Sequence, residues 1–318
     1  MPESPSVPAA YHRARSRREA NQVVEESRGV RNRLDPSRPY AVLVEEEAAP
    51  TGGSWTSHTI FLTNRTCPWR CVMCDLWKNT TSQRLAPGQV TEQVRWALAQ
   101  GPEHPQVKLY NAGSFWDDRA IHPHDRSEIA TLVRDYSRVV VECHPKLVGA
   151  RIVPFAQAID GTLEVAMGLE TADPVVLAHL NKGMTIEDFR EASSFLHQHE
   201  IDLRVFILLR PPYTSEEDTI PHARASVELA FDSGASMVAV IPTRPQNKVL
   251  ATLGDVGHFS PPSLEQLEEI QEWGISMARG RFVVDTWDIE RLYGDQPKIL
   301  ERKNILEHRN LAQNLGAL

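Results

Sequence analysis

The sequence predicts an α/β protein: a partial (β/α)6 TIM-like barrel with an N-terminal arm. Short β-rich runs alternate with helical patterns from Thr59 onward, which is typical of βα units around a parallel sheet. The length of 318 residues allows one barrel-sized domain or two ordinary ones. Cysteines gather directly after the first β-rich run, where such a barrel places its active site.

The sheet is expected to contain six strands, at 59–63, 107–111, 139–143, 163–170, 203–209 and 237–242. Between these runs apolar residues recur at three- and four-residue steps, which predicts helices at 90–100, 125–136, 148–159, 186–199 and 216–232. Ser263 and Gln266 have capping-box spacing, so a further helix is expected over 264–277. Right-handed crossovers curl such units into a barrel, and the apolar run 282–287 is expected to close it.

The chain divides by composition into an arm, a barrel and a tail. Residues 1–58 are interpreted as an Arg-rich extension, because eight arginines and four acids lie between His12 and Arg38. Such an arm suits contact with a phosphate-bearing partner. The alternative is a solvated helix packed on the domain. The barrel is expected at 59–290, and a helical tail follows at 291–318.

Charge and hydropathy exclude several classes of protein. The chain has 34 Lys+Arg against 42 Asp+Glu, a net charge of -8, so it lacks the basic footprint of a general nucleic-acid binder. No run approaches the ~18 consecutive apolar residues of a membrane-spanning helix, and the N-terminal residues lack the apolar core of a secretion signal. Four cysteines are too few for a disulfide scaffold. A cytoplasmic protein without membrane contact is expected.

Three of the four cysteines, Cys67, Cys71 and Cys74, form a CxxxCxxC motif after the first strand. Three thiolates at this spacing can hold a 4Fe-4S cluster and leave one iron open to a further ligand. A structural zinc site needs a fourth ligand, and Cys143 and His144 do not form a second paired knuckle. A zinc site and an inert or redox-sensing triad remain the alternatives.

This motif, at the end of strand one of a βα barrel, resembles the radical S-adenosylmethionine superfamily over roughly residues 57–290. The resemblance implies that Cys67, Cys71 and Cys74 hold one cluster that binds S-adenosylmethionine. One electron, supplied by a flavodoxin or ferredoxin type of donor, then cleaves the cofactor to a 5′-deoxyadenosyl radical, which removes a hydrogen atom from the substrate. Met73 stands where the superfamily usually has an aromatic residue, and its polarizable side chain can still cover an adenine face.

Further cofactor contacts follow from the resemblance at the next two strand ends. Gly113 and Ser114 belong to a turn similar to the family's Gly-Gly-Glu or Gly-Gly-Thr turn, which holds the cofactor's amine. An ordinary strand-to-loop turn uses the same residues, so both interpretations stay open. Glu142, followed by Pro145, resembles the Glu-x-x-Pro ending of the coproporphyrinogen-dehydrogenase and Elongator-like branches. Glu142 is therefore the candidate ribose contact.

The fourth and fifth strands supply further candidate cofactor contacts. Glu170 lies in a turn similar to that branch's Gly-x-Gln/Glu-Ser/Thr turn, and Lys182 lies in the segment 180–185, which resembles its Arg-Gly-His-Thr segment. Glu170 would accept hydrogen bonds from the amine or ribose, and Lys182 would pair with the carboxylate, unless it is an ordinary surface lysine. Arg204 and Arg210, near the start and at the end of the fifth strand, are further candidate carboxylate contacts.

Tyr213 and Cys143 are the candidate catalytic side chains. Pro211 and Pro212 stiffen the exit of the fifth strand and project Tyr213 toward a pocket, although Tyr213 would equally cap the barrel. Cys143 would alternatively be a buried thiol that only packs. Other side chains expected to line the substrate pocket are Tyr110, Trp116, Arg244, Asp285, Trp287 and Asp288.

The number of cysteines limits which reactions of this superfamily are possible, because Cys143 is the only cysteine outside the motif. Enzymes with a second cluster or a pair of catalytic cysteines are excluded. The core resembles the Elongator-like branch and, within it, a group that includes the archaeosine-forming radical lyase; residues 109–115 and 144–146 carry this resemblance. Resemblance at this level informs mechanism more than substrate.

The leading hypothesis is therefore a radical S-adenosylmethionine enzyme with a single cluster. Its substrate is expected to be a small, polar biosynthetic compound, nucleoside-like or bearing an amino acid. One alternative is an enzyme of the same kind that modifies a tRNA base, with RNA contacted through the Arg-rich arm. The other is a non-catalytic metal-binding or sensing protein that engages nucleic acid.

Overall fold

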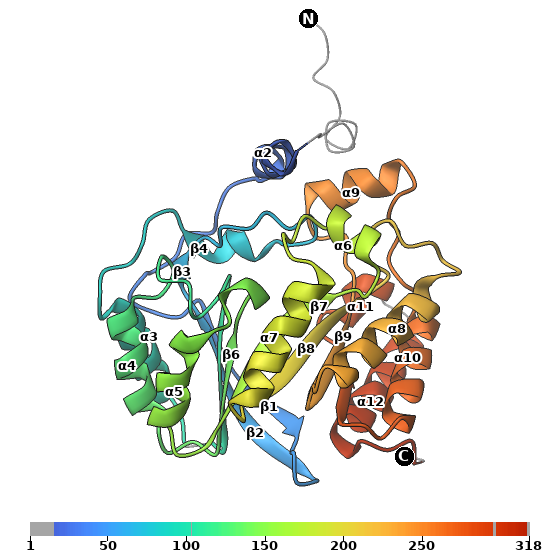
Figure 1. Ribbon diagram of the computed structural model, residues 1–318. Coiled ribbons are helices and arrows are strands. Elements are labelled where there is room, and N and C mark those ends of the chain that lie inside the picture. Colours follow the sequence, from blue (N-terminus) through green and yellow to red (C-terminus); the bar gives the residue numbers. More distant parts are fainter. Residues whose placement is uncertain (1–15, 103, 295–296, 317–318) are drawn as a thin grey trace, which may run out of the picture.

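The computed structural model describes residues 16–102, 104–294 and 297–316, with an eight-stranded sheet at its centre (Figure 1). The strand order is β1-β2-β5-β6-β7-β8-β9-β10. β1 is antiparallel to β2, and all other neighbouring strands in this order are parallel. The bounds are β1 (Ala41–Ala48), β2 (Ser54–Leu62), β5 (Gln106–Asn111), β6 (Arg138–Glu142), β7 (Thr162–Glu170), β8 (Asp202–Leu209), β9 (Met237–Pro242) and β10 (Arg281–Val284).

Helices cover the outside of this sheet, and most residues of the parallel strands are buried (Figure 1). The outer helices are α3 (Gln89–Leu98), α4 (Pro123–Leu132), α5 (Val153–Ala158), α7 (Ile186–Gln198), α8 (Thr219–Asp232), α10 (Leu264–Ser276) and α12 (Pro297–Ala312). Smaller elements are α2 (Arg17–Ser27), α6 (Pro174–His179), α9 (Lys248–Asp255), α11 (Ile289–Tyr293), β3 (Asn64–Arg65) and β4 (Thr80–Thr81). No helix in the described ranges has the length and apolarity needed to cross a membrane.

The predicted fold class is confirmed: a partial barrel of parallel strands with helices outside. All six expected strands are present. The run from residue 282 forms β10, but β10 is an edge strand of an open sheet and does not close the barrel. The arm expected to end at residue 58 is shorter, because 41–48 form β1 and β2 already begins at Ser54. The sheet therefore extends into the segment that composition assigned to the arm.

β1 joins the sheet because its acidic residues have buried partners. Glu47 pairs with Lys108 at 3.0 Å and with the guanidinium of Arg204 at 2.5 Å. Glu45 pairs with Lys108 at 2.9 Å and accepts a hydrogen bond from Thr59 at 2.6 Å. Glu45 and Glu47 thus complement basic side chains of the barrel, whereas Glu46 between them is exposed.

A second buried carboxylate, Glu164 on β7, completes this charge network. It pairs with Arg138 at 2.6 Å, with Arg281 at 2.7 Å and with Arg204. Burial alone would raise the pKa of Glu164, but the three guanidiniums hold it below its usual value. These ion pairs connect β6, β7, β8 and β10, and the opposite charges compensate one another in the buried interior.

The C-terminal helix α12 packs against both edge strands, β1 and β10. Two amide side chains from this end of the chain continue the ladder of β10. Asn310 accepts from the backbone N–H of Val284 at 3.0 Å and donates to its carbonyl at 2.7 Å. Gln313 accepts from the backbone N–H of Phe282 at 2.8 Å and donates to its carbonyl at 2.9 Å. The outer edge of β10 is therefore hydrogen-bonded, although no strand of the described residues pairs with it there.

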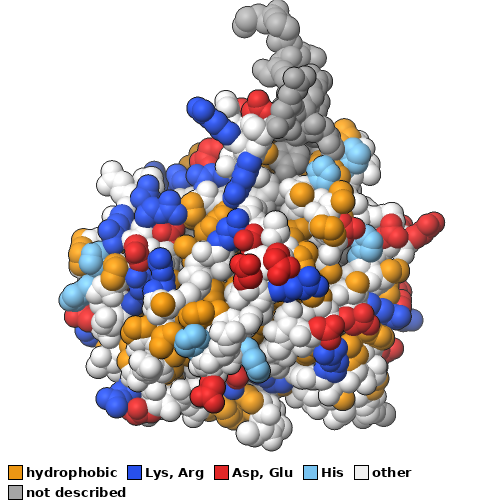
Figure 2. Space-filling model, viewed as in Figure 1, with side chains coloured by type: hydrophobic (Ala, Val, Ile, Leu, Met, Phe, Trp, Pro, Cys, Tyr) orange, Lys and Arg blue, Asp and Glu red, His pale blue; other side chains and the backbone are white. Residues whose placement is uncertain are grey.

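The Arg-rich segment lies against the body of the protein, with α2 beyond the strand ends and in contact with α9 (Figure 1). Arg31 donates to the hydroxyl of Thr66 at 3.0 Å. Arg38 lies over the ring of Trp96, with its guanidinium carbon 4.8 Å from the ring centroid. On the face shown in Figure 2, basic and acidic side chains are interspersed. Several arginines of this segment thus have partners within the chain.

Candidate functional site

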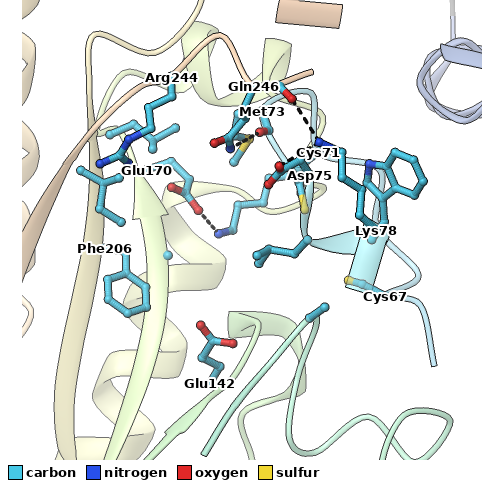
Figure 3. Close-up of a pocket in the computed structure, with 18 of the residues that line it drawn as sticks. Cys67, Cys71, Met73, Asp75, Lys78, Glu142, Glu170, Phe206, Arg244 and Gln246 are labelled. Carbon is cyan, nitrogen blue, oxygen red and sulfur yellow. Dashed lines mark hydrogen bonds and ion pairs between the residues drawn. The ribbon is translucent and has the colours of Figure 1, made fainter. Parts of the chain in front are cut away.

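A cavity of about 670 Å³ lies where the parallel strands end, and Figure 3 shows its walls. The cysteine loop after β2 forms one side, and the ends of β5, β6 and β7 form the other. Parallel strands bring such loops together, although they lie far apart in the sequence. The sequence-predicted residues that line the cavity are Cys67, Cys71, Met73, Cys74, Gly113, Glu142, Cys143, Glu170, Lys182, Arg244, Trp287 and Asp288.

The cysteine loop is held by its own backbone and by one arginine. The short strands β3 and β4 pair at its base. Arg70 donates to the carbonyl of Cys67 at 2.6 Å, which stiffens the first turn of the motif. The backbone N–H of Val72 donates to the carbonyl of Leu180 at 3.0 Å and joins the loop to the segment that carries Lys182.

The three loop thiols fit an iron–sulfur cluster. They form no disulfide, and burial raises the pKa of Cys67 to about 12 and also raises those of Cys71 and Cys74. Within the described ranges, no three His, Cys, Asp or Glu side chains are grouped closely enough to hold one metal ion. Thiolates spread along one loop suit a multi-iron cluster, because each can take a different iron. Binding such a cluster would release the thiol protons.

Gly113 lets the turn after β5 approach the cysteine loop. Its φ is +146°, and a Cβ at this position would lie 3.4 Å from the Cβ of Cys67. A side chain at this position would contact the first cysteine and would be strained by the positive φ, which favours glycine. Ser114, expected beside it in the cavity, lies behind the wall: its hydroxyl accepts from the backbone N–H of His144 at 3.2 Å and lies 3.4 Å from the thiol of Cys143.

Glu170 and Lys182 form a buried ion pair that lines the cavity (Figure 3). Burial opposes the charge of Lys182, but Glu170, followed by Cys71, raises its pKa. Glu170 has φ +68°, at an irregularity in the register of β7 and β8 after Gly168. A Cβ at Gly168 would collide with both members of the pair. The irregular strand end and the glycine together aim the pair at the cavity.

Glu142, at the end of β6, is half-buried in the cavity wall (Figure 3). Burial raises its pKa to about 7, although the backbone N–H of Asn111 donates to its carboxyl at 3.0 Å and favours ionisation. The side chain of Asn111 lines the cavity as well, and its amide atoms have no hydrogen-bond partner within the described residues. Glu142 can thus hold or release a proton near neutral pH.

This raised pKa makes the stability of the metal-free protein depend on pH. A glutamate pKa of about 7 in the folded state, against about 4.3 unfolded, means that the stabilising effect of proton binding is present below about pH 4 and is lost as pH rises through 7. Glu142→Gln removes this titration. Between about pH 5 and 8, the wild type is expected to lose up to about 3 kcal/mol of unfolding free energy relative to Glu142→Gln, measured by urea unfolding. If the unfolding free energy has the same pH dependence in the wild type and in Glu142→Gln, the raised pKa does not belong to Glu142.

Trp69 is a site residue that the sequence did not reveal, and it lies against His144, which the sequence suggested only as a zinc ligand and as part of the segment 144–146. Their rings stack with centroids 3.6 Å apart and planes 5° apart. His144 Nδ1 accepts from the backbone N–H of Lys146 at 3.2 Å, so the ring's proton lies on Nε2, which donates to the carbonyl of Lys182 at 3.2 Å. Burial lowers the pKa of His144 to about 3, so the ring is neutral. For Trp69, the only signal in the sequence is its position between Cys67 and Cys71.

Three predicted residues lie away from the cavity. Arg204, expected as a carboxylate contact, lies inside the barrel and is engaged by Glu47 and Glu164, because it sits near the start of β8. Tyr110 lies there too, and its hydroxyl accepts from Arg204 at 3.2 Å. Trp116 is fully buried in the main hydrophobic core. None of the three is part of the cavity wall.

Arg210 and Tyr213 follow β8 but also lie outside the cavity wall. Arg210 donates to the carbonyl of Pro261 at 3.3 Å. Tyr213 lies between His179 and His258, with ring centroids 4.5 and 5.4 Å away. Its φ of +72° turns the chain at this point, so the tyrosine caps the barrel edge near α9.

The far wall of the cavity carries polar side chains (Figure 3). Arg244 pairs with Asp285 at 2.9 Å, which places Asp285 behind the wall. Gln246 donates to the carbonyl of Met73 at 3.2 Å, and thereby joins this wall to the cysteine loop. The amide of Gln246 thus lies beside the cysteine loop, and Arg244 adds a guanidinium to the same cavity (Figure 3).

No family model matches the sequence. The chain is 28% identical over 217 residues to archaeosine synthase subunit beta of Thermococcus kodakarensis, a match that covers 64% of this chain. It is 25% identical over 224 residues to archaeosine synthase subunit beta of Methanosarcina acetivorans, with 67% of this chain covered. Each match spans 65% of the length of the relative.

The fold is also found in solved structures. The archaeal Elp3 of Methanocaldococcus infernus matches with a TM-score of 0.53 and 13% identity, over 80% of this chain and 63% of that one. Methylornithine synthase matches with a TM-score of 0.52 and 15% identity, over 87% of this chain and 73% of that one. At such identities the likeness concerns the fold.

Proposed function

We infer that this chain is a radical S-adenosylmethionine enzyme with one 4Fe-4S cluster on Cys67, Cys71 and Cys74. Its similarity to archaeosine synthase subunit beta, and the fold that it shares with Elp3 and methylornithine synthase, support this proposal. The observation that carries the proposal is the convergence of these three thiols with the Glu170–Lys182 pair on one cavity. When bound, the cluster and S-adenosylmethionine would supply a 5′-deoxyadenosyl radical that removes a hydrogen atom from the substrate.

The residues of this chain would bind and orient the cofactor. An amino acid end carries an ammonium and a carboxylate, and the Glu170–Lys182 pair offers one charge complementary to each. Glu142 lies deeper in the cavity wall, where it suits a contact to a ribose hydroxyl. Met73 lines the same cavity and is the candidate contact for the adenine face.

The remaining cavity walls would exclude water from the reaction. Trp69 stacked on His144 covers one side, and Phe206, Leu208 and Ile241 cover another. A dry, rigid enclosure protects a reactive species from quenching. Cys143 also lines the cavity and remains a candidate for a role on the substrate side, whereas Tyr213 lies outside the wall.

The substrate is proposed to be a small polar molecule, nucleoside-like or bearing an amino acid. A cavity of about 670 Å³ lies in the size range of small-molecule sites. Arg244 and Gln246 line the cavity and are the proposed donors for its polar groups. An electron donor of the flavodoxin or ferredoxin type is the proposed partner, because the cluster must be reduced.

The test is an anaerobic assay. Protein reconstituted with iron and sulfide, then mixed with S-adenosylmethionine and dithionite, is expected to form 5′-deoxyadenosine above a protein-free control, measured by mass spectrometry. Protein that takes up one zinc, no cluster, and forms no 5′-deoxyadenosine would instead support a non-catalytic metal-binding protein.

Modification of a tRNA base is the second candidate, and the relatives named archaeosine synthase subunit beta favour it. It predicts a complex with bulk tRNA whose affinity falls steeply with salt, because each phosphate contact releases counterions. Filter binding at several salt concentrations distinguishes the candidates: tight tRNA binding at moderate salt would overturn the small-molecule proposal.

A further inference from the structure

We propose that residues 17–33, which we call the cap, cover the cluster loop and that Arg28 of the cap raises the reduction potential of the cluster. The inference rests on the proposed function, since it requires a cluster on the three loop cysteines. The sequence left two interpretations of the Arg-rich segment, contact with a phosphate-bearing partner or a helix packed on the domain. The contacts of the cap run to the cysteine loop, to the segment that carries Lys182 and to α9.

Polar contacts tie the cap to the site. Glu25 forms an ion pair with Arg70, the same arginine that donates to the carbonyl of Cys67 at 2.6 Å. Asn21 accepts from the side chain of Asn181 at 2.9 Å. The cap therefore holds both the cysteine loop and the loop that precedes Lys182.

Apolar packing and backbone hydrogen bonds complete the cover. Val24, 3% exposed, belongs to a small core with Val72 of the cysteine loop and Leu250 of α9. After α2 ends, the backbone N–H of Asn32 donates to the carbonyl of Lys78 at 2.9 Å. These contacts lie on both sides of Arg28, so the position of this arginine is fixed by its neighbours in the chain.

Arg28 points into the site. Its side chain is 8% exposed and lines the cavity together with Cys67 and Cys74. Its guanidinium carbon lies 5.3 Å from the ring centroid of Trp77, and Nη1 contacts Glu25 at 3.3 Å. Nε is buried and has no hydrogen-bond partner among the described residues. A guanidinium stays charged under these conditions.

The charge at this place is only partly balanced. Glu25 is 46% exposed and is shared between Arg28 and Arg70, so two guanidiniums face one carboxylate beside the loop. A cluster gains one negative charge when it is reduced, and nearby positive charge stabilises that state. Arg28 is therefore expected to raise the reduction potential, and no contact with the substrate is needed for this effect.

A second cavity, of about 380 Å³, explains why the cap also matters for protection. It lies between the cap and α9, and Arg28, Cys74 and Trp77 line both cavities. The Cys74 side of the cluster would thus face the underside of the cap. Loosening the cap would open this side to water and to chelators.

The first experiment measures the midpoint potential by redox titration with electron paramagnetic resonance. In Arg28→Gln the ratio of reduced to oxidised cluster at a fixed potential is expected to fall about tenfold, which equals a shift of about 59 mV to lower potential for one electron. Arg28→Lys keeps the charge and is expected to retain the wild-type potential. Arg33→Gln removes the same charge from an exposed position of the cap and serves as the matched control. Equal potentials in Arg28→Gln and Arg33→Gln would overturn the proposal.

The second experiment measures iron release to a chelator and does not depend on Arg28. Val24→Ser weakens the packed face of the cap and is expected to speed release several-fold. Val30→Ser makes the same change at a side chain that is 92% exposed and is expected to leave the rate unchanged. Equal rates would show that the cap does not cover the cluster. Cleavage of S-adenosylmethionine by the wild type tests the proposed function separately, so the two failures remain distinguishable.

Discussion

Cys71→Ala is expected to abolish both cluster binding and formation of 5′-deoxyadenosine, down to the level of the protein-free control. Each loop thiolate would ligate a different iron, so two cysteines leave a second iron without a protein ligand. Cys71 lies at the centre of the loop, and the charge of Lys182 lies near its thiol. Iron and sulfide content per chain and the assay for 5′-deoxyadenosine measure the two effects.

Cys143→Ala is the matched control for ligation. Cys143 is 3% exposed, and its thiol lies 3.4 Å from the hydroxyl of Ser114 and 3.3 Å from the carbonyl of His144. These contacts keep it away from the loop, so this variant is expected to bind iron at the wild-type level. Full iron content in Cys71→Ala, or its loss in Cys143→Ala, would show that the loop is not the cluster site.

Glu164→Gln is expected to lower the free energy of unfolding by about 3–5 kcal/mol. Glu164 is fully buried and faces Arg138, Arg204 and Arg281. The amide keeps the shape but leaves guanidiniums in the barrel interior without their shared counter-charge, and such charges are costly away from water. Urea unfolding at neutral pH, followed by circular dichroism, measures the loss.

Glu269→Gln tests whether this loss comes from burial. Glu269 pairs with Arg224 at 2.9 Å on the surface, where the two side chains are 52% and 40% exposed. Surface pairs of this kind contribute at most about 1 kcal/mol. A similar loss in both variants would mean that the buried network has no special role in stability.

Sequence periodicity predicted the parallel strands because each is a short apolar run between helices. β1 escaped prediction for a physical reason: Glu45 and Glu47 suggest a solvated segment unless their partners are known. Those partners, Lys108 and Arg204, lie on strands far away in the sequence. Charge complementarity across a barrel interior leaves no local pattern, so the boundary of the arm was placed too late.

The parts of the site formed by residues close together in the sequence could be predicted. The parts that depend on where a residue lies along its strand, or on contacts between distant loops, could not. The spacing of its three cysteines is sufficient to identify the cysteine loop. Arg204 was misplaced because its position near the start of β8 turns it to the closed end of the barrel, opposite the cavity. The stack of Trp69 on His144 joins two loops that only the folded chain brings together. No periodicity in either segment encodes it.

The amides of Asn310 and Gln313 have a consequence for self-association. A free strand edge offers backbone donors and acceptors to any passing chain, and this is how sheet proteins aggregate. In this protein the groups of Phe282 and Val284 are already occupied by side chains of the same molecule. A second copy of the protein would have to displace the side chains of Asn310 and Gln313 before its own strand could pair with this edge of the sheet.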